Sequence, residues 1–517
     1  MSAVLEQEET TESPSKDYDE IKSKIQGNVL RAYGHDRVRY FMLKVAKPAA
    51  ARQWLGAIAT DEKHAKLRIT TEEEFFCVLC EQLSKVSTLT AKQNVLKKPP
   101  GYAFNIAMTW EGLKALGLPD DSLSSFPIEF RQGMHRRAVK LGDIGKSAPS
   151  TWPAPFDDPS DIHLIASIYA SSDDELKYAQ DLLEDSWIDK PFNVKGIRDG
   201  LNFEKGMVHF GYKDGISQPR FEGVPDPKRY EDCQPKVTLG TLLLGKKYKS
   251  EYEGVQWKVP FPKEELGENG CFNAFRVLSQ DVVGFEDYLD TAAKELMQSQ
   301  YSLELLPDGE EKKFGPEFTR FKAFREIVAA KMCGRWRNGA PLELYPKFQP
   351  PNPDKRTFSE FDYGNAKLDG PVDGSRCPFG AHTRRANPRG AHIVQRVANN
   401  TRRLVRRGMP YGPEYKRGDG NDGIERGLLG NFLGADLGAQ FEAVMCDWLN
   451  LGAQDTRITG YNDPLLGAND PDISSFEILL ESGKTIRLQG LPRFIHCRGG
   501  AYTFIPSLPA IRYLASL

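Results

Sequence analysis

The feature that most limits how this chain can fold is the order in which strand-like and helix-like patterns follow one another. A strand is predicted over Arg39 to Val45, where alternate residues share one face. A helix follows behind Pro48, because apolar residues recur there at helical spacing. Two further strands are expected at Ala103 to Met108 and at Asp161 to Tyr169.

A second helix and a closing strand complete this series. Ser172 and Glu175 have the spacing of a capping box, and apolar residues follow them on one helical stripe. Gly206 to Tyr212 is predicted to be the fourth strand. The order strand, helix, strand, strand, helix, strand is that of a ferredoxin-like fold.

The second half of the chain repeats this order. Its strands are expected at Cys271 to Leu278, at Gly427 to Leu433 and, as a closing pair, at Phe494 to Arg498 and Tyr502 to Ile505. One helix follows Val282 and another spans Leu437 to Leu449. The chain has 517 residues, more than the roughly 250 to 300 at which a single core stops growing. We therefore expect an α+β protein of two ferredoxin-like domains, whose antiparallel sheets are flanked by helices.

Composition places the domain boundaries. Residues 1–17 are acidic and rich in Ser and Thr, and we expect a disordered lead there. The first domain is predicted over residues 18–224 and the second over residues 236–517. Between them, Pro225 to Pro235 is rich in proline and charge, as linkers are.

The charge balance excludes several classes of partner. Lys and Arg number 69 against 71 Asp and Glu, for a formal net charge of -2, so no global field recruits nucleic acid or an anionic membrane. The first residues lack the basic start and apolar stretch of a secretory signal. No run approaches about 18 apolar residues. We expect a cytoplasmic protein with neither a nucleic-acid nor a membrane partner, and the composition leaves a homo-oligomer open.

The eight cysteines are scattered, and Cys77 and Cys80 form a CxxC pair. A zinc site needs a second ligand pair at suitable spacing, and the sequence offers none. Because Phe75 to Leu79 is apolar, buried reduced thiols are favoured over a metal or redox pair.

Among the eight histidines, His382 stands in unusual surroundings. It lies in Cys377-Pro-Phe-Gly-Ala-His382-Thr-Arg-Arg-Ala-Asn-Pro-Arg389, inside a long irregular stretch from Tyr345 to Gly420. Loops of that length inside a folded domain tend to be functional or disordered. Taken alone, a histidine beside arginines is more often structural or exposed.

Two other segments carry groups suited to chemistry. Asp214 lies between Gly211 and Gly215, so a tight bend there would present its carboxylate and let backbone approach a bulky group. Alone, this pattern is more often a plain Asp-Gly turn. Arg402 to Arg407 is an arginine cluster, which by itself favours a solvated face or a phosphate site.

Together and in this order, the three segments resemble the dye-decolourising peroxidase family. That family is marked by a GxxDG signature, here Gly211 to Gly215, and by a proximal histidine ahead of Asn-Pro-Arg, here His382 and Arg389. Its distal arginine corresponds to Arg406. Shorter matches span the chain: Gln26-Gly-Asn-Val-Leu, Phe130-Arg-Gln-Gly-Met, Gly334-Arg-Trp, Gly427-Leu-Leu, Arg498-Gly-Gly and Pro506-Ser-Leu. The length looks like the longer branch of the family.

The resemblance implies a fold related to the dimeric α+β barrel and a non-covalent haem b with His382 as axial iron ligand. It implies that hydrogen peroxide and an organic electron donor are the substrates, and that bulky dyes and phenols are oxidised through a ferryl intermediate. Asp214 would move the peroxide proton and Arg406 would stabilise the developing charge. Gly211 and Gly215 would let backbone approach the haem.

The same resemblance raises questions about individual residues. Arg389 suits a haem propionate by charge and position. Glu442 is the candidate hydrogen-bond partner of His382, with Asp447 as the runner-up. If Arg406 is not the distal arginine, Arg407 or Arg403 is next.

The chain departs from the compact members of the family at one position. Those members have an asparagine two residues beyond the distal arginine, where this chain has Gly408, so an asparagine-assisted mechanism is not expected.

Two alternatives to a peroxidase stay open. One is a haem carrier, for which His382 alone would suffice. The other is a haem-dependent deferrochelatase, which would remove iron.

Overall fold

A computed structural model gives the structure of most of the chain. It describes residues 15–62, 65–85, 101–225, 236–248, 262–359, 361–363, 374–389, 399–418, 420–452 and 455–517. The predicted linker falls outside these residues except for Pro225.

The first half of the chain contributes four strands. They are β1 (Arg37–Val45), β2 (Tyr102–Met108), β3 (Leu164–Ala170) and β4 (Phe192–Leu201). Helix α2 (Pro48–Ile58) follows β1 and α8 (Asp173–Asp185) follows β3. As predicted, Pro48 stands in the first turn of α2, and the Ser172 side chain caps α8 by accepting from the Glu175 amide at 3.2 Å.

The second half repeats this arrangement with longer insertions. Its strands are β7 (Cys271–Gln280), β8 (Val405–Arg406), β9 (Met409–Tyr411), β10 (Gly427–Gly434) and β13 (Ile495–Ile505). Helix α10 (Val282–Gln298) follows β7. The helix predicted after β10 is wound as two π-helical segments, η9 (Leu437–Glu442) and η10 (Val444–Asn450).

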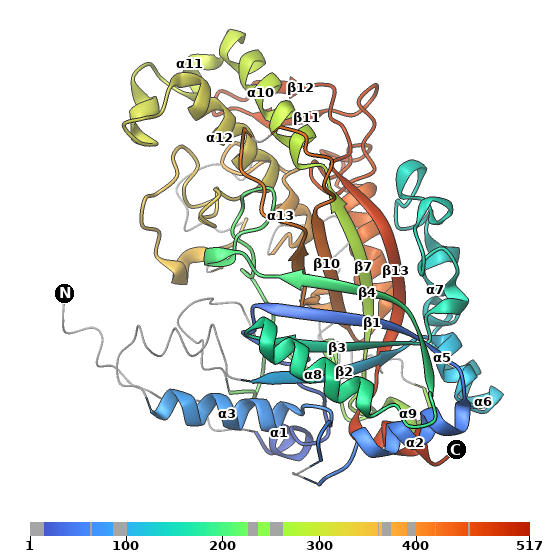
Figure 1. Ribbon diagram of the computed structural model, residues 1–517. Coiled ribbons are helices and arrows are strands. Elements are labelled where there is room, and N and C mark those ends of the chain that lie inside the picture. The colour runs from blue at the N-terminus through green and yellow to red at the C-terminus, as the bar shows by residue number, and fades with distance from the viewer. Residues whose placement is uncertain are drawn as a thin grey trace.

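In the described part of the chain, these nine strands form one sheet. Their order is β4-β1-β3-β2-β13-β7-β10-β8, with β9 also paired to β10, and every neighbouring pair runs antiparallel. Each half of that order has its fourth strand beside its first, as a ferredoxin-like fold does. In Figure 1 the strands of the first half-sheet run across those of the second. The predicted α+β fold of two ferredoxin-like halves is confirmed.

Other elements surround this sheet. The remaining α-helices are α1 (Lys16–Ile21), α3 (Glu72–Ser84), α5 (Trp110–Ala115), α6 (Asp120–Ser125), α7 (Ile128–Arg137), α9 (Glu264–Gly267), α11 (Ser302–Leu305), α12 (Arg320–Cys333), α13 (His382–Ala386) and α14 (Leu508–Ala515). Two small ribbons pair β5 (Arg220–Phe221) with β6 (Lys236–Val237) and β11 (Phe476–Leu479) with β12 (Thr485–Leu488). Short 3-10 turns are η1 (Gly145–Ser147), η2 (Pro149–Thr151), η3 (Pro159–Asp161), η4 (Glu204–Gly206), η5 (Leu239–Thr241), η6 (Glu310–Lys313), η7 (Lys355–Phe358) and η8 (Asn399–Arg402).

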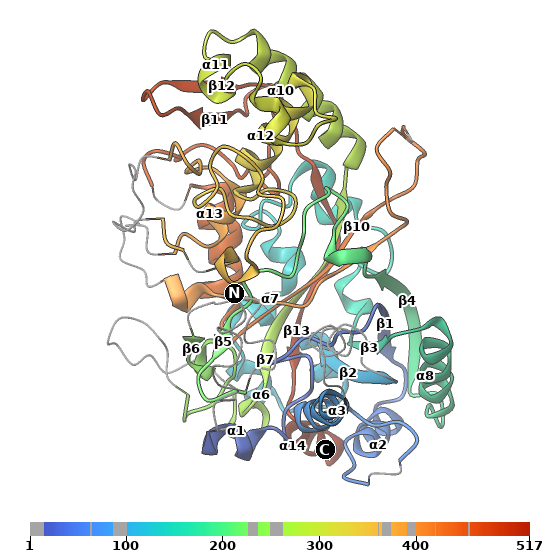
Figure 2. The ribbon, with the colours of Figure 1, turned by 90° about the vertical axis from the view of Figure 1, so that its left-hand side faces the viewer.

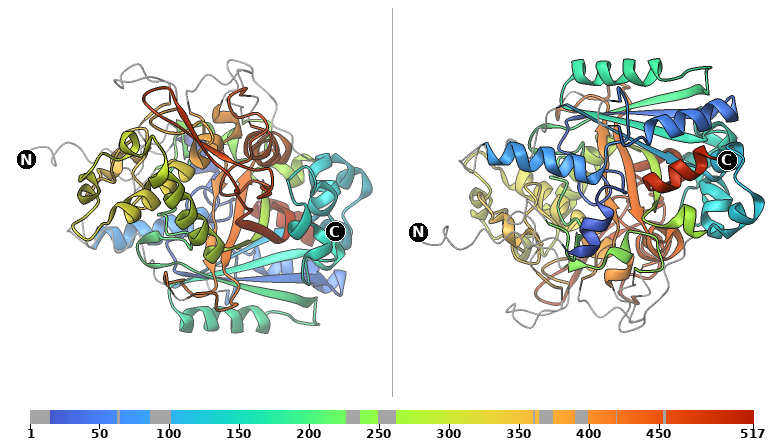
Figure 3. Two further views of the ribbon diagram at one scale, coloured as in Figure 1. Left: turned by 90° about the horizontal axis from the view of Figure 1, so that it is seen from above. Right: turned by 90° about the horizontal axis from the view of Figure 1, so that it is seen from below.

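The helices pack in groups around the sheet. Figure 2 shows α10, α11 and α12 together at one end of the molecule and α14 beside α2 at the other, with α13 between the two groups. Figure 3 shows α8 on the outside of the first half-sheet, which it contacts along β1, β2 and β3. In the described residues, no helix is long and apolar enough to cross a membrane.

An aromatic core joins the two half-sheets. Strand β13 pairs with β7 along its length and with β2 at Phe504 and Met108. Around this seam, the ring of Phe504 lies 5.9 Å from that of Phe272 and 5.6 Å from that of Phe126, centroid to centroid. All these side chains are buried, so one continuous core supports both halves.

The fourth strand of the first half differs from the prediction. It is β4, whereas Gly206 to Tyr212 forms a turn-rich loop, so that prediction is wrong. Strand β4 lies at the end of the sheet and exposes most of its side chains. Its sequence therefore lacks the apolar alternation that identifies a strand buried on one face.

The closing strands of the second half also differ from the prediction. They form one strand, β13, with a bulge between Cys497 and Gly499. A side chain at Gly499 would collide with the ring of Phe156, and one at Gly500 with the sulfur of Met134. Gly499 and Gly500 lie between the two predicted strands, and at both positions another side chain packs directly on the backbone of β13.

The CxxC pair lies on α3, and both side chains are exposed, so the prediction of buried thiols is wrong. Phe75 and Leu79 are the buried residues of this stretch. They lie four residues apart on one helical face, which turns Cys77 and Cys80 towards solvent.

The two ends of the sheet approach each other without pairing as strands. Strand β4 contacts β9, although they stand at opposite ends of the strand order. Gly200 makes this approach feasible, because a β-carbon there would lie 2.8 Å from Val38 Cγ1 and 3.1 Å from Met409 Cβ. The sheet therefore curls round until its first and last strands touch.

Replacing Gly200 with valine should force β4 and β9 apart. Overpacking of this kind costs about 1–3 kcal/mol, measurable by urea unfolding followed by circular dichroism. Gly56→Ala is the matched control, since its β-carbon would find Ala515 Cβ at an ordinary 3.5 Å in helix α2. Equal stability of Gly200→Val and wild type would show that the two ends do not need this contact.

Candidate active site

Three segments far apart in the sequence bring charged and ligating groups together. Asp214 lies on the loop 206–218 after β4, His382 begins α13, and Arg406 ends β8. Arg406 Nη1 and Asp214 Oδ1 are 3.7 Å apart. The charges of both residues act on the pKa of His382, so all three share one site.

The loop 206–218 is folded tightly around Asp214. The Asp214 amide donates to the Gly206 carbonyl at 2.8 Å, and Lys213 donates its amide to the Arg337 carbonyl at 2.9 Å. The Arg337 guanidinium donates back to the Phe210 carbonyl and occupies the space that a β-carbon of Gly211 would take. Gly211 is therefore fixed by close packing as well as by its positive φ of 73°.

The same loop holds Arg406 in place. The Gln218 side-chain oxygen accepts from the Arg406 amide at 3.1 Å, and the Ile216 carbonyl accepts from Arg406 Nη2 at 2.5 Å. The side chains of Arg406 and Asp214 stay 39% and 47% exposed, so both present polar atoms to open space. Their separation is too long for a tight hydrogen bond, which leaves each group available to a ligand.

His382 is oriented by a buried carboxylate that the sequence prediction missed. His382 Nδ1 lies 3.0 Å from Asp463 Oδ2. The other oxygen, Oδ1, accepts from the amides of Leu465 and Leu466 at 2.9 and 2.8 Å. With Nδ1 donating to the carboxylate, the lone pair of Nε2 is free to ligate a metal.

The two groups shift each other's titration. Burial lowers the pKa of His382, but the charge and hydrogen bond of Asp463 outweigh it, and the pKa lies above its ordinary value. Burial raises the pKa of Asp463, but the charge and hydrogen bond of His382 outweigh it, and the pKa lies below its ordinary value. Asp463 is therefore a carboxylate that strengthens the electron donation of its histidine.

Glu442 is not the partner of His382, so that prediction is wrong. Its buried carboxylate is held by Arg137, whose Nη2 donates at 2.5 Å, by Tyr502 at 2.9 Å and by Lys140 at 3.3 Å. Asp447, the runner-up, pairs with Arg402 instead. The π-helical winding of this segment differs from the α-helix on which both choices rested.

The sequence carried one local signal for Asp463. It stands in Asn462-Asp463-Pro464, after the segment that carries Glu442 and Asp447. An aspartate before a proline favours a turn, and here its carboxylate caps the two amides that follow the proline. Nothing in that turn points to His382, which is 81 residues away.

Arg389 is occupied by protein groups. Its Nη1 donates to the carbonyls of Ser359 and Phe361 at 2.7 and 3.2 Å, and its Nη2 lies 3.4 Å from Ser217 Oγ. These bonds tie the His382 segment to the loop that carries Asp214. A role toward a haem propionate stays a prediction.

Arg407 points away from the site. Its guanidinium donates to the carbonyls of Asn28 and Val29, on the other side of β8 from Asp214. Of the arginines considered for the distal position, Arg406 is the one placed beside Asp214.

Comparison with known proteins gives the family. A family model described as the DyP dimeric alpha+beta barrel domain matches residues 24–195. A dye-decolorizing peroxidase of Exidia glandulosa is 29% identical over 444 residues, covering 83% of this chain and 77% of that protein. The multifunctional dye peroxidase DyP2 of an Amycolatopsis species is 25% identical over 517 residues, covering 95% of each chain. A solved dye-decolorizing peroxidase in complex with 2,6-dimethoxyphenol is 25% identical with a TM-score of 0.71, over 96% of this chain and 99% of that one.

The chain is similar along most of its length to dye-decolourising peroxidases, and part of its first half matches their family model. This confirms the resemblance drawn from the three segments, and it makes the protein a peroxidase. Dye-decolourising peroxidases are haem enzymes. The donor set fits such a group: His382 offers a free imidazole nitrogen, and Asp214 and Arg406 stand ready to face it.

Replacing Asp463 with asparagine should reverse the pKa shift of His382 in haem-free protein. In wild type the raised pKa means that protonated His382 stabilises the fold at low pH, and this stabilisation is lost as pH rises through the folded-state pKa. Without the Asp463 carboxylate, burial is the largest remaining influence, and the pKa should fall below its ordinary value. A pH titration followed by carbon-13 NMR of the histidine rings measures the pKa of His382. His209, whose pKa burial lowers, is the internal control and should not move.

Replacing Glu442 with alanine should destabilise the fold without disturbing the environment of His382. Arg137 would keep only its longer ion pair with Glu129, at 3.7 Å, and breaking a buried pair of this kind costs about 3–5 kcal/mol. Asp447→Ala is the matched control, because its pair with Arg402 is partly exposed and worth about 1 kcal/mol or less. Urea unfolding compares them, and similar losses would mean that Glu442 has no special structural role.

Proposed function

We propose that this protein uses hydrogen peroxide to oxidise phenols and bulky dyes, with a non-covalent haem b ligated by His382. The observation that carries the proposal is the meeting of Asp214 and Arg406 beside a histidine whose Nδ1 is held by a carboxylate. A solved relative binds 2,6-dimethoxyphenol, which supports a phenol as reducing substrate.

His382 would hold the haem iron through Nε2. When bound, haem supplies the redox-active iron that peroxide oxidises and that the reducing substrate then reduces. Asp463 keeps the proton of His382 on Nδ1 and fixes the plane of the ring. Because Asp463 is itself fixed by two backbone amides, the ligand would keep one orientation through the reaction.

Asp214 would carry the peroxide proton. Its carboxylate would accept the proton from one oxygen of hydrogen peroxide and return it to the other, which leaves as water. The tight loop around Asp214 holds that carboxylate still while leaving it 47% exposed toward the ligand space. One carboxylate can therefore serve both oxygens in turn.

Arg406 would stabilise the negative charge that develops as the bond breaks. A guanidinium stays protonated across the working pH range. Nη2 is committed to the Ile216 carbonyl, whereas Nη1 faces Asp214 at 3.7 Å, and so Nη1 is the donor placed for peroxide.

The distal pair favours a peroxidase over the alternatives. A haem carrier needs His382 but gives Asp214 and Arg406 no shared role. A haem-dependent deferrochelatase would release iron, so retention of iron by the haem after peroxide treatment would exclude it. Neither alternative accounts for a loop that holds both charged side chains toward one space.

Variants of haem-loaded protein test these roles by stopped-flow absorbance after one equivalent of peroxide. Asp214→Asn should slow the reaction about 100-fold or more, because it removes the proton carrier. Arg406→Leu should slow it by about 10²–10³-fold through lost charge stabilisation. His382→Ala should lose the normal ferric spectrum.

The controls separate chemistry from binding. Asp214→Asn and Arg406→Leu should retain haem at wild-type stoichiometry, and Asp447→Asn, a matched carboxylate change elsewhere, should react at the wild-type rate. A peroxide reaction of Asp214→Asn as fast as wild type would show that another group moves the proton.

A further inference from the structure

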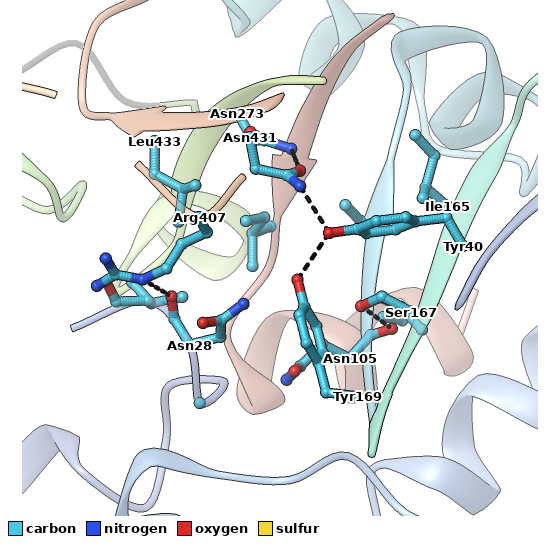
Figure 4. A pocket seen from close by; sticks show the side chains of 15 residues that line it. Asn28, Tyr40, Asn105, Ile165, Ser167, Tyr169, Asn273, Arg407, Asn431 and Leu433 are labelled. Atoms are coloured by element: carbon cyan, nitrogen blue, oxygen red, sulfur yellow. Dashed lines mark hydrogen bonds between the residues drawn. The ribbon is translucent and has the colours of Figure 1, made fainter. Parts of the chain in front are cut away.

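A small cavity lies between the two half-sheets, outside the loop that carries Asp214. Its volume is about 50 Å³. Both half-sheets line it, Tyr40, Asn105 and Tyr169 from the first and Asn273 and Asn431 from the second (Figure 4). At roughly 10–15 Å³ for each water, it holds about three to five waters or one ligand of about four heavy atoms. Haem and dyes are too large for it.

Arg407 brings a buried positive charge to this cavity. Its Nε, Nη2 and Nη1 donate to the backbone carbonyls of Asn28, Val29 and Arg406 at 2.8, 3.1 and 3.1 Å. These three acceptors are neutral, and two of the five guanidinium N–H groups are left over. Across the described ranges, no carboxylate lies within ion-pair distance of this side chain, which is 8% exposed.

A carboxylate that could compensate the charge of Arg407, that of Glu72, already pairs with other residues. Glu72 is buried and acts on Arg407 electrostatically, but its Oε1 forms an ion pair with Arg31 Nε at 3.0 Å and accepts from the Tyr18 hydroxyl at 3.2 Å. Burial therefore prevails and lowers the pKa of Arg407 to about 10. A buried cation without a counter-ion is costly, so an anion beside it would be bound favourably.

The paired tyrosines add a free donor to the same cavity. Asn273 donates to the Asn431 side-chain oxygen at 2.8 Å, which fixes the Asn431 amide so that its nitrogen donates to Tyr40 at 2.8 Å. Tyr40 and Tyr169 share one hydrogen bond of 2.9 Å. The two rings have two phenol protons, and the bond between them uses one. Within the described chain the other has no acceptor, so it is available to a ligand.

Two buried acceptors show what else a ligand must offer. The side-chain oxygens of Asn105 and Asn273 line the cavity and have no hydrogen-bond partner among the described residues, although the two residues are 8% and 3% exposed. Buried polar atoms are rarely left unpaired. A ligand with its own hydroxyl group, or one that arrives with a water, would satisfy them.

We propose that this cavity binds a small planar monovalent oxyanion of the hydrogencarbonate or formate class, held between Arg407 and the phenol pair. Figure 4 shows Arg407 on one side of the space and Tyr40 with Tyr169 on the other. One guanidinium matches one negative charge. Hydrogencarbonate carries a hydroxyl group for the unpaired amide oxygens, so it should bind more tightly than formate, and formate more tightly than spherical chloride.

Thermal unfolding of the haem-loaded protein tests the site. Sodium hydrogencarbonate, formate and chloride are compared at pH 8 and constant ionic strength, with gluconate, which is too large for the cavity, as the balancing anion. Saturating hydrogencarbonate should raise Tm by about 2 °C over gluconate. Because small anions also reach ferric haem, the Soret band is recorded in the same samples.

Two variants locate the effect. Arg407→Gln removes the charge, and Tyr40→Phe combined with Tyr169→Phe removes both hydroxyl groups but keeps the rings; each variant should weaken binding at least about tenfold, erasing most of the Tm rise. Tyr178→Phe, exposed on α8, is the matched control and should respond like wild type. If Arg407→Gln does not fold, the double tyrosine variant carries the comparison.

Specific outcomes would overturn the proposal. One is no difference in Tm between hydrogencarbonate and gluconate in wild type. Another is a rise that persists in both variants, which would place the anion elsewhere. A crystal structure in hydrogencarbonate should show planar density bonded to Arg407, whereas waters alone in the cavity would also contradict it.

Discussion

The contact between the first and last strands of the sheet determines where everything else lies. Strands β4 and β9 stand at opposite ends of the strand order, and they touch because Gly200 has no side chain to keep Met409 away. The loop after β4 carries Asp214, and β8, next to β9 in the chain, carries Arg406. The pair of Asp214 and Arg406 is therefore assembled by tertiary closure, with each member contributed by a different end of one sheet.

Once the ends meet, a single loop keeps the geometry. Residues 206–218 present Asp214, hold the backbone and guanidinium of Arg406, and bond through Ser217 to Arg389 in the His382 segment. Arg337 fixes the turn at Gly211 from outside. A loop without a long helix or strand is thus held in place by hydrogen bonds to several other parts of the chain.

The sequence predicted those parts of the site and fold whose signal is local. His382, Asp214 and Arg406 each sit in a short motif, and the buried strands show their alternation of apolar residues. The role of Asp463 was not predicted, because its bond to His382 joins two segments far apart in the chain that no spacing rule connects. Strand β4 was not predicted, because an exposed edge strand can be polar on both faces. The cytoplasmic location and the domain boundaries stay predictions.

Because the site is divided between the two ends of the sheet, neither half of the chain carries all of its residues. Each half contains a complete ferredoxin-like strand order of its own. The second half, however, holds the histidine and the arginine, and the carboxylate comes from the first. A fragment comprising the second half would keep the residues for ligating a metal but lack the carboxylate proposed to carry the proton. With the roles proposed for these residues, neither half alone would hold the complete set for peroxide chemistry.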